Sequence, residues 1–433
     1  MDLLYNKLDL KKIKAKDKEK FEKSIKRGFH CQEVSVFNPN YTLFSLDDLD
    51  LKKFNSKTEI VKLLKKKKNK KIHINGHIYK ALLKSEKKYF FKDIFCKECP
   101  CYNPLNITLN VDKVCGIYEQ FVINDSINNI NSQVNIEVFI SYLLSKLVEN
   151  KISPNFPLFF GNSFAILNKY TSEINNKEIA LIQDNTSVNY RLFIGNNISY
   201  LERYNFPVNI IFSEKMDNDL YNYIYDKPYI DDSEWLSIIF QIILGLTSCQ
   251  KYFKIYHNDL HLSNIMFSNT KLEYLYYSYN NVYFKVPTYS KIIKIIDWGR
   301  ATYNFNGFKG NNFIFRKDGD AFGQYYYNKI NKKGKKNIDP NPSFDLALLG
   351  CNLSIEPLFP KKGKLFRLIN SWININNNVI DKQLIEENSF KLYTFLSRFA
   401  NKSIPHKQIL KSCFKQFIVN ELDITDKQDV YYI

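Results

Sequence analysis

The sequence reads His-Asn-Asp-Leu-His-Leu-Ser-Asn at residues 257–264, and Lys-Ile-Ile-Lys-Ile-Ile-Asp-Trp-Gly follows at residues 291–299. Before these stretches, residues 236–252 carry apolar side chains at helical spacing and no proline, which predicts a helix. A short apolar run after Asn264 and another before Asp297 predict two strands. Asp259 and Asn264 therefore lie at opposite ends of one loop, and Asp297 ends the next strand. We expect the three side chains to converge.

Phosphoryl transfer from a nucleotide needs few protein groups. It requires a carboxylate that orients the attacking hydroxyl, an amide and a second carboxylate that hold magnesium, and a lysine for the phosphates. Asp259, Asn264 and Asp297 supply the first three in the expected order. In these two motifs the chain resembles the protein-kinase-like superfamily. Residues 257–264 resemble the catalytic loop of that superfamily, and residues 291–299 resemble its metal-binding turn. The resemblance implies that Asp259 is the catalytic base, that Asn264 and Asp297 bind Mg²⁺, and that ATP is the donor. Gly299 is expected to let the backbone turn sharply after the metal ligand.

Two departures from the family pattern refine the resemblance. Asn258 stands where the resembling kinases have an arginine that commonly receives an activation-loop phosphate, so a phosphorylation switch is not expected. Residues 274–289 hold two strand-like runs around Asn280-Asn281, which is a hairpin signal. With His261 two residues after the Asp, this insertion resembles haspin-type kinases and related proteins of large DNA viruses. The two motifs also resemble aminoglycoside and choline phosphotransferases, which share the lobe design and act on small molecules.

The lysine that binds phosphate is expected on a strand upstream, with a helical glutamate to hold it. An apolar run ends in Lys97, which we choose, and Lys92 is the alternative because three aromatic residues precede it. Residues 135–149 have apolar side chains at helical spacing, and Glu137 falls in the first turn, where a carboxylate suits the helix dipole. The alternative interpretation is that Glu137 is a solvent-exposed charge at the N-terminus of the helix. We predict a Lys97–Glu137 ion pair that, by the resemblance, contacts the α and β phosphates.

The glycine-rich phosphate loop is the weakest part of the match. A regular G-x-G-x-x-G is absent, and the corresponding stretch, Asn75-Gly76-His77-Ile78, has one glycine. Gly76 and Ile78 are its candidate nucleotide contacts. One glycine still allows close approach of the backbone to a phosphate, although Asn-Gly is more often an ordinary hairpin turn. Residues 210–216 read as a strand followed by polar residues. Glu214 and Met216 of this linker are expected to offer main-chain donors and acceptors to adenine.

A chain of 433 residues suits two lobes plus an extension. We expect a basic N-terminal extension over residues 1–72 with a helix near residues 59–67, a kinase small lobe over 73–216 and a kinase large lobe over 217–433. The predicted fold is α+β and bilobal, with a sheet-rich small lobe and a helical large lobe. In the resembling kinases an Asp at the position of Asp345 is buried and braces the catalytic loop. Small-molecule phosphotransferases build this region differently, so Asp345 favours a protein substrate.

The formal net charge is +18, with lysine runs at residues 11–26 and 62–71. A nucleic-acid surface is one interpretation. We favour a solvated surface, because the runs lack the interleaved aromatic residues typical of single-strand binding. Apolar residues make up 45% of the chain, which argues against disorder. No run of eighteen apolar residues and no apolar N-terminal segment occur, so neither a membrane span nor a secretory signal is expected.

Cysteine spacing gives one further hint. Cys96, Cys99 and Cys101 lie close together, with Cys115 downstream, which resembles a metal-ligand cluster. No histidine lies near and Lys97 falls within the first gap, so we favour buried free thiols in a reducing compartment.

These features together predict an ATP-dependent phosphotransferase, most simply a serine/threonine protein kinase that works with magnesium. A small-molecule phosphotransferase is one alternative. A pseudokinase scaffold is the other alternative. The weak glycine loop favours it, as does the lack of the Ala-Pro-Glu sequence that ends the activation segment of protein kinases. The presence of Asp259, Asn264 and Asp297 argues against it. The expected location is intracellular, in the host cytoplasm or the virion if the chain is viral.

Overall fold

A computed structural model describes most of the chain. The described residues are 23, 31–37, 57–66, 75–86, 88–105, 131–183, 190–195, 198–305, 308–310, 312–316, 319–325, 340–375, 378–387, 390–424 and 430–433. They fall into two compact units. The sheet unit lies within Asp9–Tyr142 and Phe159–Lys215, and the helical unit includes Leu143–Leu158 and Met216–Ile433. The chain has a mixed α+β fold, as the sequence predicts at this level.

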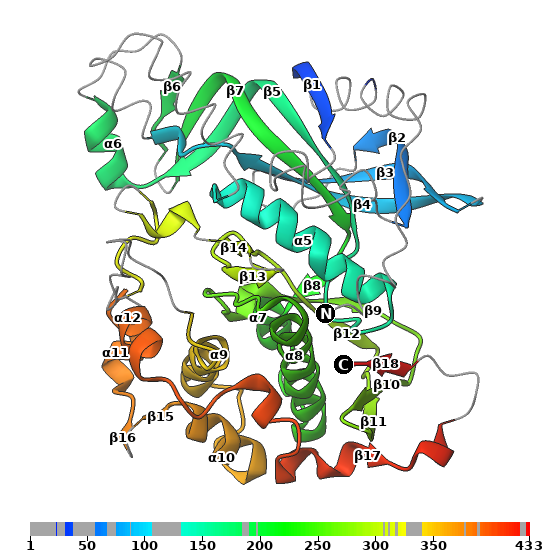
Figure 1. The fold of residues 1–433 in the computed structure, drawn as a ribbon. Coiled ribbons are helices and arrows are strands. Elements are labelled where there is room, and N and C mark those ends of the chain that lie inside the picture. The colour runs from blue at the N-terminus through cyan, green and yellow to red at the C-terminus, as the bar shows by residue number, and fades with distance from the viewer. Residues whose placement is uncertain are drawn as a thin grey trace. The chain divides into compact units, whose positions relative to one another are not determined.

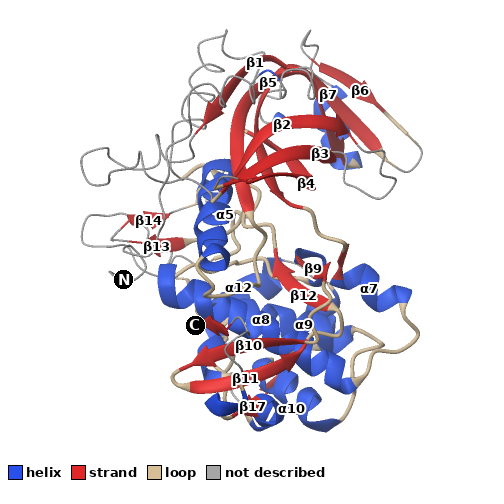
Figure 2. Ribbon diagram, turned by 90° about the vertical axis from the view of Figure 1, so that its right-hand side faces the viewer, coloured by secondary structure: helices blue, strands red, loops and turns tan. Residues whose placement is uncertain are grey.

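The sheet unit is built on one curled antiparallel sheet (Figure 2). Its strand order is β1-β5-β7-β4-β3-β2, and β6 pairs with the outer part of β7. The strands are β1 (Cys31–Phe37), β2 (Thr58–Lys66), β3 (Gly76–Ser85), β4 (Lys88–Pro100), β5 (Phe159–Ile174), β6 (Tyr190–Phe193) and β7 (Ser199–Glu214). Helix α6 (Asn176–Gln183) belongs to this unit, and the division between the units falls within α5 (Gln133–Glu149).

Strand β2 shows that the predicted helix near residues 59–67 is wrong. Ile60 and Leu63 are buried, whereas Lys62 and Lys65 are exposed, and the strand pairs antiparallel with β3. A short apolar run of this kind fits helical and strand spacing equally well. The backbone ladder and the buried surface that β3 offers decide the outcome.

Much of the N-terminal region lies outside the described residues. This applies to the lysine run at residues 11–26 except Lys23, to residues 67–74, and to Cys115. The described parts of the first 72 residues include β1 and β2, which are strands of the main sheet.

The helical unit surrounds the long helix α8 (Asp232–Phe253) (Figure 1). Its other helices are α7 (Leu220–Asp226), α9 (Phe344–Ile355), α10 (Gly363–Trp372), α11 (Lys382–Glu386) and α12 (Phe390–Phe399). Helix α9 contacts α10, α11 and α12. After α12, Pro405–Lys407 and Ser412–Phe417 form 3₁₀ helices.

Helix α8 confirms the helix predicted for residues 236–252 and explains its apolar character. The Asp231 side chain accepts a hydrogen bond from the Ser233 backbone N–H at its N-terminus, and Lys254 ends it in a left-handed conformation. Within the described part of the chain, α8 is the one helix long and apolar enough to cross a membrane. Most of its side chains are buried inside the helical unit.

Short strands set the position of the two sequence motifs. Strands β12 (Lys291–Ile295), β9 (Ile265–Asn269) and β8 (Asn218–Asp219) form a small sheet in that order. Strands β10 (Tyr274–Tyr279) and β11 (Val282–Pro287) form the predicted hairpin. Asn280 and Asn281 take positive φ angles of 49° and 61° at its turn. The C-terminal strand β18 (Val430–Tyr432) pairs parallel with β10, and β17 (Ile418–Val419) pairs with β11.

Candidate active site

Asp345 fixes the backbone at the start of the 257–264 loop. It lies in the first turn of α9 and is completely buried. Its Oδ2 accepts a hydrogen bond from the His257 N–H at 3.0 Å, and its Oδ1 accepts one from the Asn258 N–H at 2.8 Å. Burial raises the pKa of this carboxyl, and the two backbone donors oppose that effect. Two donors on one carboxylate hold the peptide just before Asp259 in a single orientation.

Asn258 connects this loop to the segments that follow Asp297. Its backbone is left-handed, with φ of 67°, a conformation that asparagine tolerates better than most residues. Its amide donates to the Arg300 carbonyl at 3.0 Å and to the Thr302 hydroxyl at 3.2 Å. The Tyr325 hydroxyl donates to its side-chain oxygen, and the Gln324 amide donates to its backbone carbonyl at 2.5 Å. Neutral groups thus join the loop to residues 300–325.

Asp259 is held from two sides through one oxygen. Its Oδ1 accepts hydrogen bonds from Arg300 Nη1 at 3.1 Å and from the Tyr393 hydroxyl at 2.8 Å. Burial and the adjacent Asp259 carboxylate raise the pKa of the Tyr393 hydroxyl, which keeps it protonated and a donor. Sequence reasoning missed both partners. Arg300 directly follows the Asp-Trp-Gly motif, whereas Tyr393 comes from α12 and carries no local signal.

Asn264 closes the other end of the loop. Its amide nitrogen donates to the Asp259 carbonyl at 3.0 Å and lies 3.1 Å from His261 Nε2. Burial lowers the pKa of His261, and the neutral ring then accepts the Asn264 bond at Nε2. With its nitrogen engaged, Asn264 has its amide oxygen as the atom suited to a metal ion.

Asp297 follows β12 and is exposed, in contrast to its neighbours. Its φ is 63°, and a left-handed non-glycine residue stores backbone strain of a kind that clusters at functional sites. Gly299 is not among the positive-φ residues, so the sharp turn occurs at Asp297 and the expectation for Gly299 is wrong. The next residue, Trp298, is buried, and its indole N–H donates to the Ile295 carbonyl at 3.3 Å.

Backbone and ring contacts link the Asp297 turn to the 257–264 loop. The Ile296 N–H donates to the Asn264 carbonyl at 3.0 Å, and His257 Nε2 lies 2.8 Å from the Ile296 carbonyl. The His257 and Trp298 rings are 4.6 Å apart. The structure therefore brings together the two motifs, including Asp259, Asn264 and Asp297, within the helical unit.

The donor chemistry of this site fits a hard divalent cation. Among the described residues, no group of three or more His, Cys, Asp or Glu side chains is arranged to hold a metal by itself. Asn264 and Asp297 offer an amide oxygen and a carboxylate. Magnesium is typically bound by one or two protein oxygens together with substrate phosphates and water. The pair fits Mg²⁺ in that mode and does not form an all-protein metal cage.

In the sheet unit, Lys97 Nζ lies 2.5 Å from Glu137 Oε1. The Lys97 side chain is 35% exposed, whereas that of Glu137 is 9% exposed, so the lysine is the accessible member. Cys99 Sγ donates to the second Glu137 oxygen at 3.7 Å. The alternative lysine, Lys92, instead lies 3.9 Å from Glu214. The two residues chosen from the sequence are in contact, and their role with phosphate stays a prediction.

The remaining predicted nucleotide contacts are distributed along the chain. Gly76 opposes Lys97 across the β3–β4 ladder, and Ile78 opposes Phe95. Glu214 ends β7, and the sulfur of Met216, in the helical unit, accepts a hydrogen bond from the Ser268 hydroxyl at 3.4 Å. The turn before Gly76 lies outside the described residues.

The cysteines near Lys97 are buried and free of disulfides. Cys96, Cys99 and Cys101 all lie on or directly after β4. Burial raises the pKa of the Cys96 and Cys101 thiols, which keeps them protonated.

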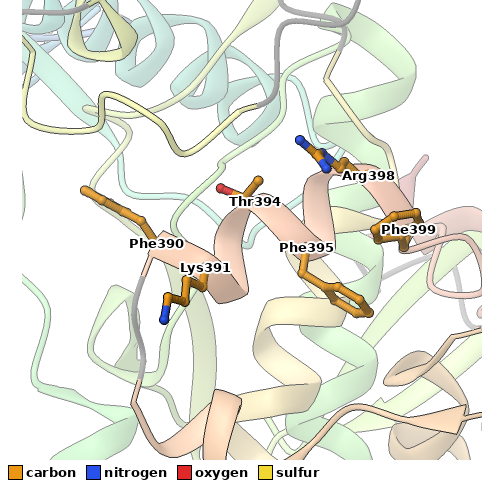
Figure 3. Close-up of a pocket in the computed structure, with 6 residues that line it drawn as sticks. All are labelled: Phe390, Lys391, Thr394, Phe395, Arg398 and Phe399. Atoms are coloured by element: carbon orange, nitrogen blue, oxygen red, sulfur yellow. The ribbon is translucent and has the colours of Figure 1, made fainter.

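Helix α12 also forms a surface pocket of about 440 Å³ (Figure 3). It is lined by Phe390, Lys391, Thr394, Phe395, Arg398 and Phe399. The Thr394 hydroxyl donates to the Gly323 carbonyl at 2.8 Å, which ties the pocket helix to residues 319–325. The helix that contacts Asp259 through Tyr393 thus carries an accessible aromatic and cationic surface.

Comparisons of the chain with protein-family models and with curated proteins found no match. The function is therefore inferred from the geometry of these residues.

Proposed function

We propose that the chain is an ATP-dependent phosphotransferase of the protein-kinase-like superfamily, with a bilobal arrangement, that phosphorylates serine or threonine in a protein. The observation that carries the proposal is the contact between Asp345 and the His257 and Asn258 backbone. Burying a carboxylate costs free energy unless the group is hydrogen-bonded, and the Asp345 carboxylate accepts two backbone hydrogen bonds. Here it orients the peptide that presents Asp259, next to a strained, exposed Asp297.

In this proposal each residue has a separate task. Asp259 orients the acceptor hydroxyl and accepts its proton, while Arg300 and Tyr393 fix the direction of its carboxylate. Lys97, held by Glu137, is assigned to the donor's α and β phosphates. Asn264 and Asp297 hold Mg²⁺, which would supply neutralisation of the charge that develops on the transferred phosphoryl group.

A protein acceptor is preferred to a small alcohol for two reasons. Asp345 sits on a helix that small-molecule phosphotransferases build differently. The pocket on α12 also offers Lys391 and Arg398 beside aromatic side chains, a surface suited to a chain larger than a sugar or choline. The net charge of +18 favours acidic partners through faster encounter.

The test is transfer from γ-labelled ATP with magnesium to a mixed protein lysate, run beside a panel of aminoglycosides, choline and sugars. Phosphoserine or phosphothreonine in protein is expected, and Asp297→Asn should abolish it while the variant stays folded. Labelled small molecules with unlabelled protein would show that the acceptor is a small molecule and not a protein. ATP binding without any transfer would favour the scaffold alternative, and full activity in Asp297→Asn would remove the metal assignment.

A further inference from the structure

Strands β2, β3 and β4 lie side by side in the sheet (Figure 2). By their pairing register, one face of these strands is rich in lysine and aromatic residues. In the β3–β4 ladder, Leu82 opposes Phe91 and Lys84 opposes Tyr89. Because successive side chains alternate between the two faces of a strand, these residues share one face. Strand β2 adds two more lysines. The aromatic–lysine face consists of Lys62, Lys65, Lys80, Lys84, Tyr89 and Phe91.

The aromatic rings on this face are open to solvent. Tyr89 is 55% exposed and Phe91 is 62% exposed. The ammonium of Lys80 lies 5.3 Å from the centre of the Phe91 ring, and that of Lys84 lies 5.7 Å from the Tyr89 ring. Large exposed aromatic side chains that gather among cations are uncommon on a surface without a binding role.

The opposite face of the same strands accounts for the core. It carries the buried side chains Ile60, Leu63, Ala81, Leu83 and Ile94. Packing therefore gives a reason for those residues but none for Tyr89 and Phe91.

The aromatic–lysine face is positive but not uniformly so. Glu59 opposes Lys84, and Asp93 opposes Lys80, so two carboxylates lie among the four lysines. The remaining excess of positive charge has the same sign as the chain's formal net charge of +18. The charge fits an anionic ligand.

We propose that the aromatic–lysine face binds single-stranded nucleic acid. Proteins that bind single strands combine cations along the backbone with aromatic rings on which bases stack. Tyr89 and Phe91 are two residues apart on β4, which corresponds to about 6.6 Å. Neighbouring bases can therefore each use one ring, while the lysines contact phosphates. The interleaving that the lysine runs lack along the sequence arises here across three strands.

The two other anionic partners fit less well. An acidic peptide would satisfy the lysines and would leave two exposed rings without a role. An anionic membrane surface would also satisfy the lysines, but it offers no flat rings on which Tyr89 and Phe91 could stack. Stacking on bases uses both the rings and the cations.

The site is separate from the residues assigned to phosphoryl transfer. Phe91 is six residues from Lys97 on the extended strand β4, which corresponds to about 20 Å. Binding at the aromatic–lysine face is therefore independent of the proposed function, and the two are tested separately.

The experiment measures fluorescence anisotropy of a short labelled polypyrimidine strand, as DNA and as RNA, with the full chain at several salt concentrations. The double variant Tyr89→Ser/Phe91→Ser should weaken binding by roughly tenfold or more, because base stacking on both rings is lost. The variant Lys62→Ser/Lys80→Ser should reduce the steepness of the salt dependence by about 1.4, or roughly 0.7 for each lost phosphate contact. Tyr229→Ser is the matched control, since Tyr229 is 66% exposed in the helical unit.

Circular dichroism and thermal unfolding show whether each variant is folded. Photo-crosslinking of the unaltered chain to a thiouridine-containing strand, mapped by mass spectrometry, gives a second result that needs no variant. Crosslinks on the β4 peptide that holds Tyr89 and Phe91 are expected. Absence of binding, equal binding by the folded aromatic variant, or binding to anionic vesicles or an acidic peptide instead of the strand would each overturn the proposal.

Discussion

The Tyr393 hydroxyl donates a hydrogen bond to Asp259 Oδ1 across 2.8 Å, although 134 residues separate the two in the chain. Arg300 Nη1 donates to the same oxygen at 3.1 Å. Two donors on one carboxylate oxygen restrict rotation of the Asp259 side chain. The other oxygen is then the one that can accept a hydrogen bond from the hydroxyl group of the substrate. Under the proposed function, Tyr393 is a positioning residue for the base.

Tyr393→Phe removes this hydrogen bond and keeps the ring in place. A net loss of about 1 kcal/mol in the transition state corresponds to roughly a fivefold lower kcat. KM for ATP should be unchanged, because the bond orients the acceptor side of the reaction. Steady-state kinetics with varied ATP measure both quantities.

The matched control is Tyr225→Phe, which removes a hydroxyl that donates to Glu356 at 3.3 Å elsewhere in the helical unit. This control should keep normal kcat. A rise in KM for ATP with normal kcat in Tyr393→Phe would show that Tyr393 does not act through Asp259.

Asp345→Asn tests the brace on the loop. An amide can accept only through its oxygen, so one of the two backbone N–H groups loses its acceptor in a completely buried place. The free energy of unfolding should fall by about 1–3 kcal/mol, with a parallel loss of turnover. Denaturant unfolding measures the first effect. Asp381→Asn is the control, because Asp381 caps α11 in an exposed position that asparagine caps equally well.

The same variant should alter the dependence of stability on pH. Burial raises the pKa of Asp345 above its ordinary value of 3.8, so the folded chain holds this proton more tightly than the unfolded chain does. Its contribution to the free energy of unfolding is therefore largest below pH 3.8 and falls as the pH rises through the raised pKa. The stability advantage of the wild type over Asp345→Asn should shrink across that range. An advantage that grows with pH there would contradict the assignment.

Features that depend on local sequence pattern can be predicted from the sequence alone. The helix before the 257–264 loop, the Asn280-Asn281 hairpin and the strand before Asp297 follow from periodicity and turn chemistry, and the structure contains all three. Lys97 and Glu137 were paired from the order of a strand and a helix, and the two side chains are in contact.

Other features depend on tertiary contacts and cannot be predicted from the sequence alone. The sequence predicts a helix where β2 lies, because its apolar residues fit helical and strand spacing equally well and only pairing with β3 decides between them. Tyr393 gave no signal because its role comes from the path of α12. The left-handed backbone at Asp297 was assigned to Gly299, since glycine is the usual residue for that conformation.

Asn258 predicts that activity does not depend on phosphorylation of the segment after Asp297. Asn258 is joined to the Arg300 carbonyl, Thr302, Gln324 and Tyr325 by neutral groups, and it carries no charge that could pair with a phosphate. The Arg300 guanidinium contacts Asp259. Treatment with a broad phosphatase, followed by its removal, should leave turnover unchanged. Tyr325→Phe should lower the free energy of unfolding by about 1 kcal/mol through the lost hydrogen bond to Asn258. A phosphatase-treated chain that loses activity, and regains it after incubation with ATP, would show a switch that these contacts do not provide.

Lys97→Met tests the group assigned to the phosphates. Its loss leaves the Glu137 carboxylate, which is 9% exposed, without its cation, so the free energy of unfolding should fall by about 1–3 kcal/mol. Under the proposed function the positive charge acts on the donor's phosphates in the transition state, and kcat should fall by roughly a hundredfold or more. Lys92→Met is the control on the same strand, because Lys92 lies 3.9 Å from Glu214 and should be dispensable. Initial rates of transfer and thermal unfolding of both variants separate the two effects. An inactive Lys92→Met beside an active Lys97→Met would move the phosphate contact five residues along β4 and end the proposed role of the ion pair.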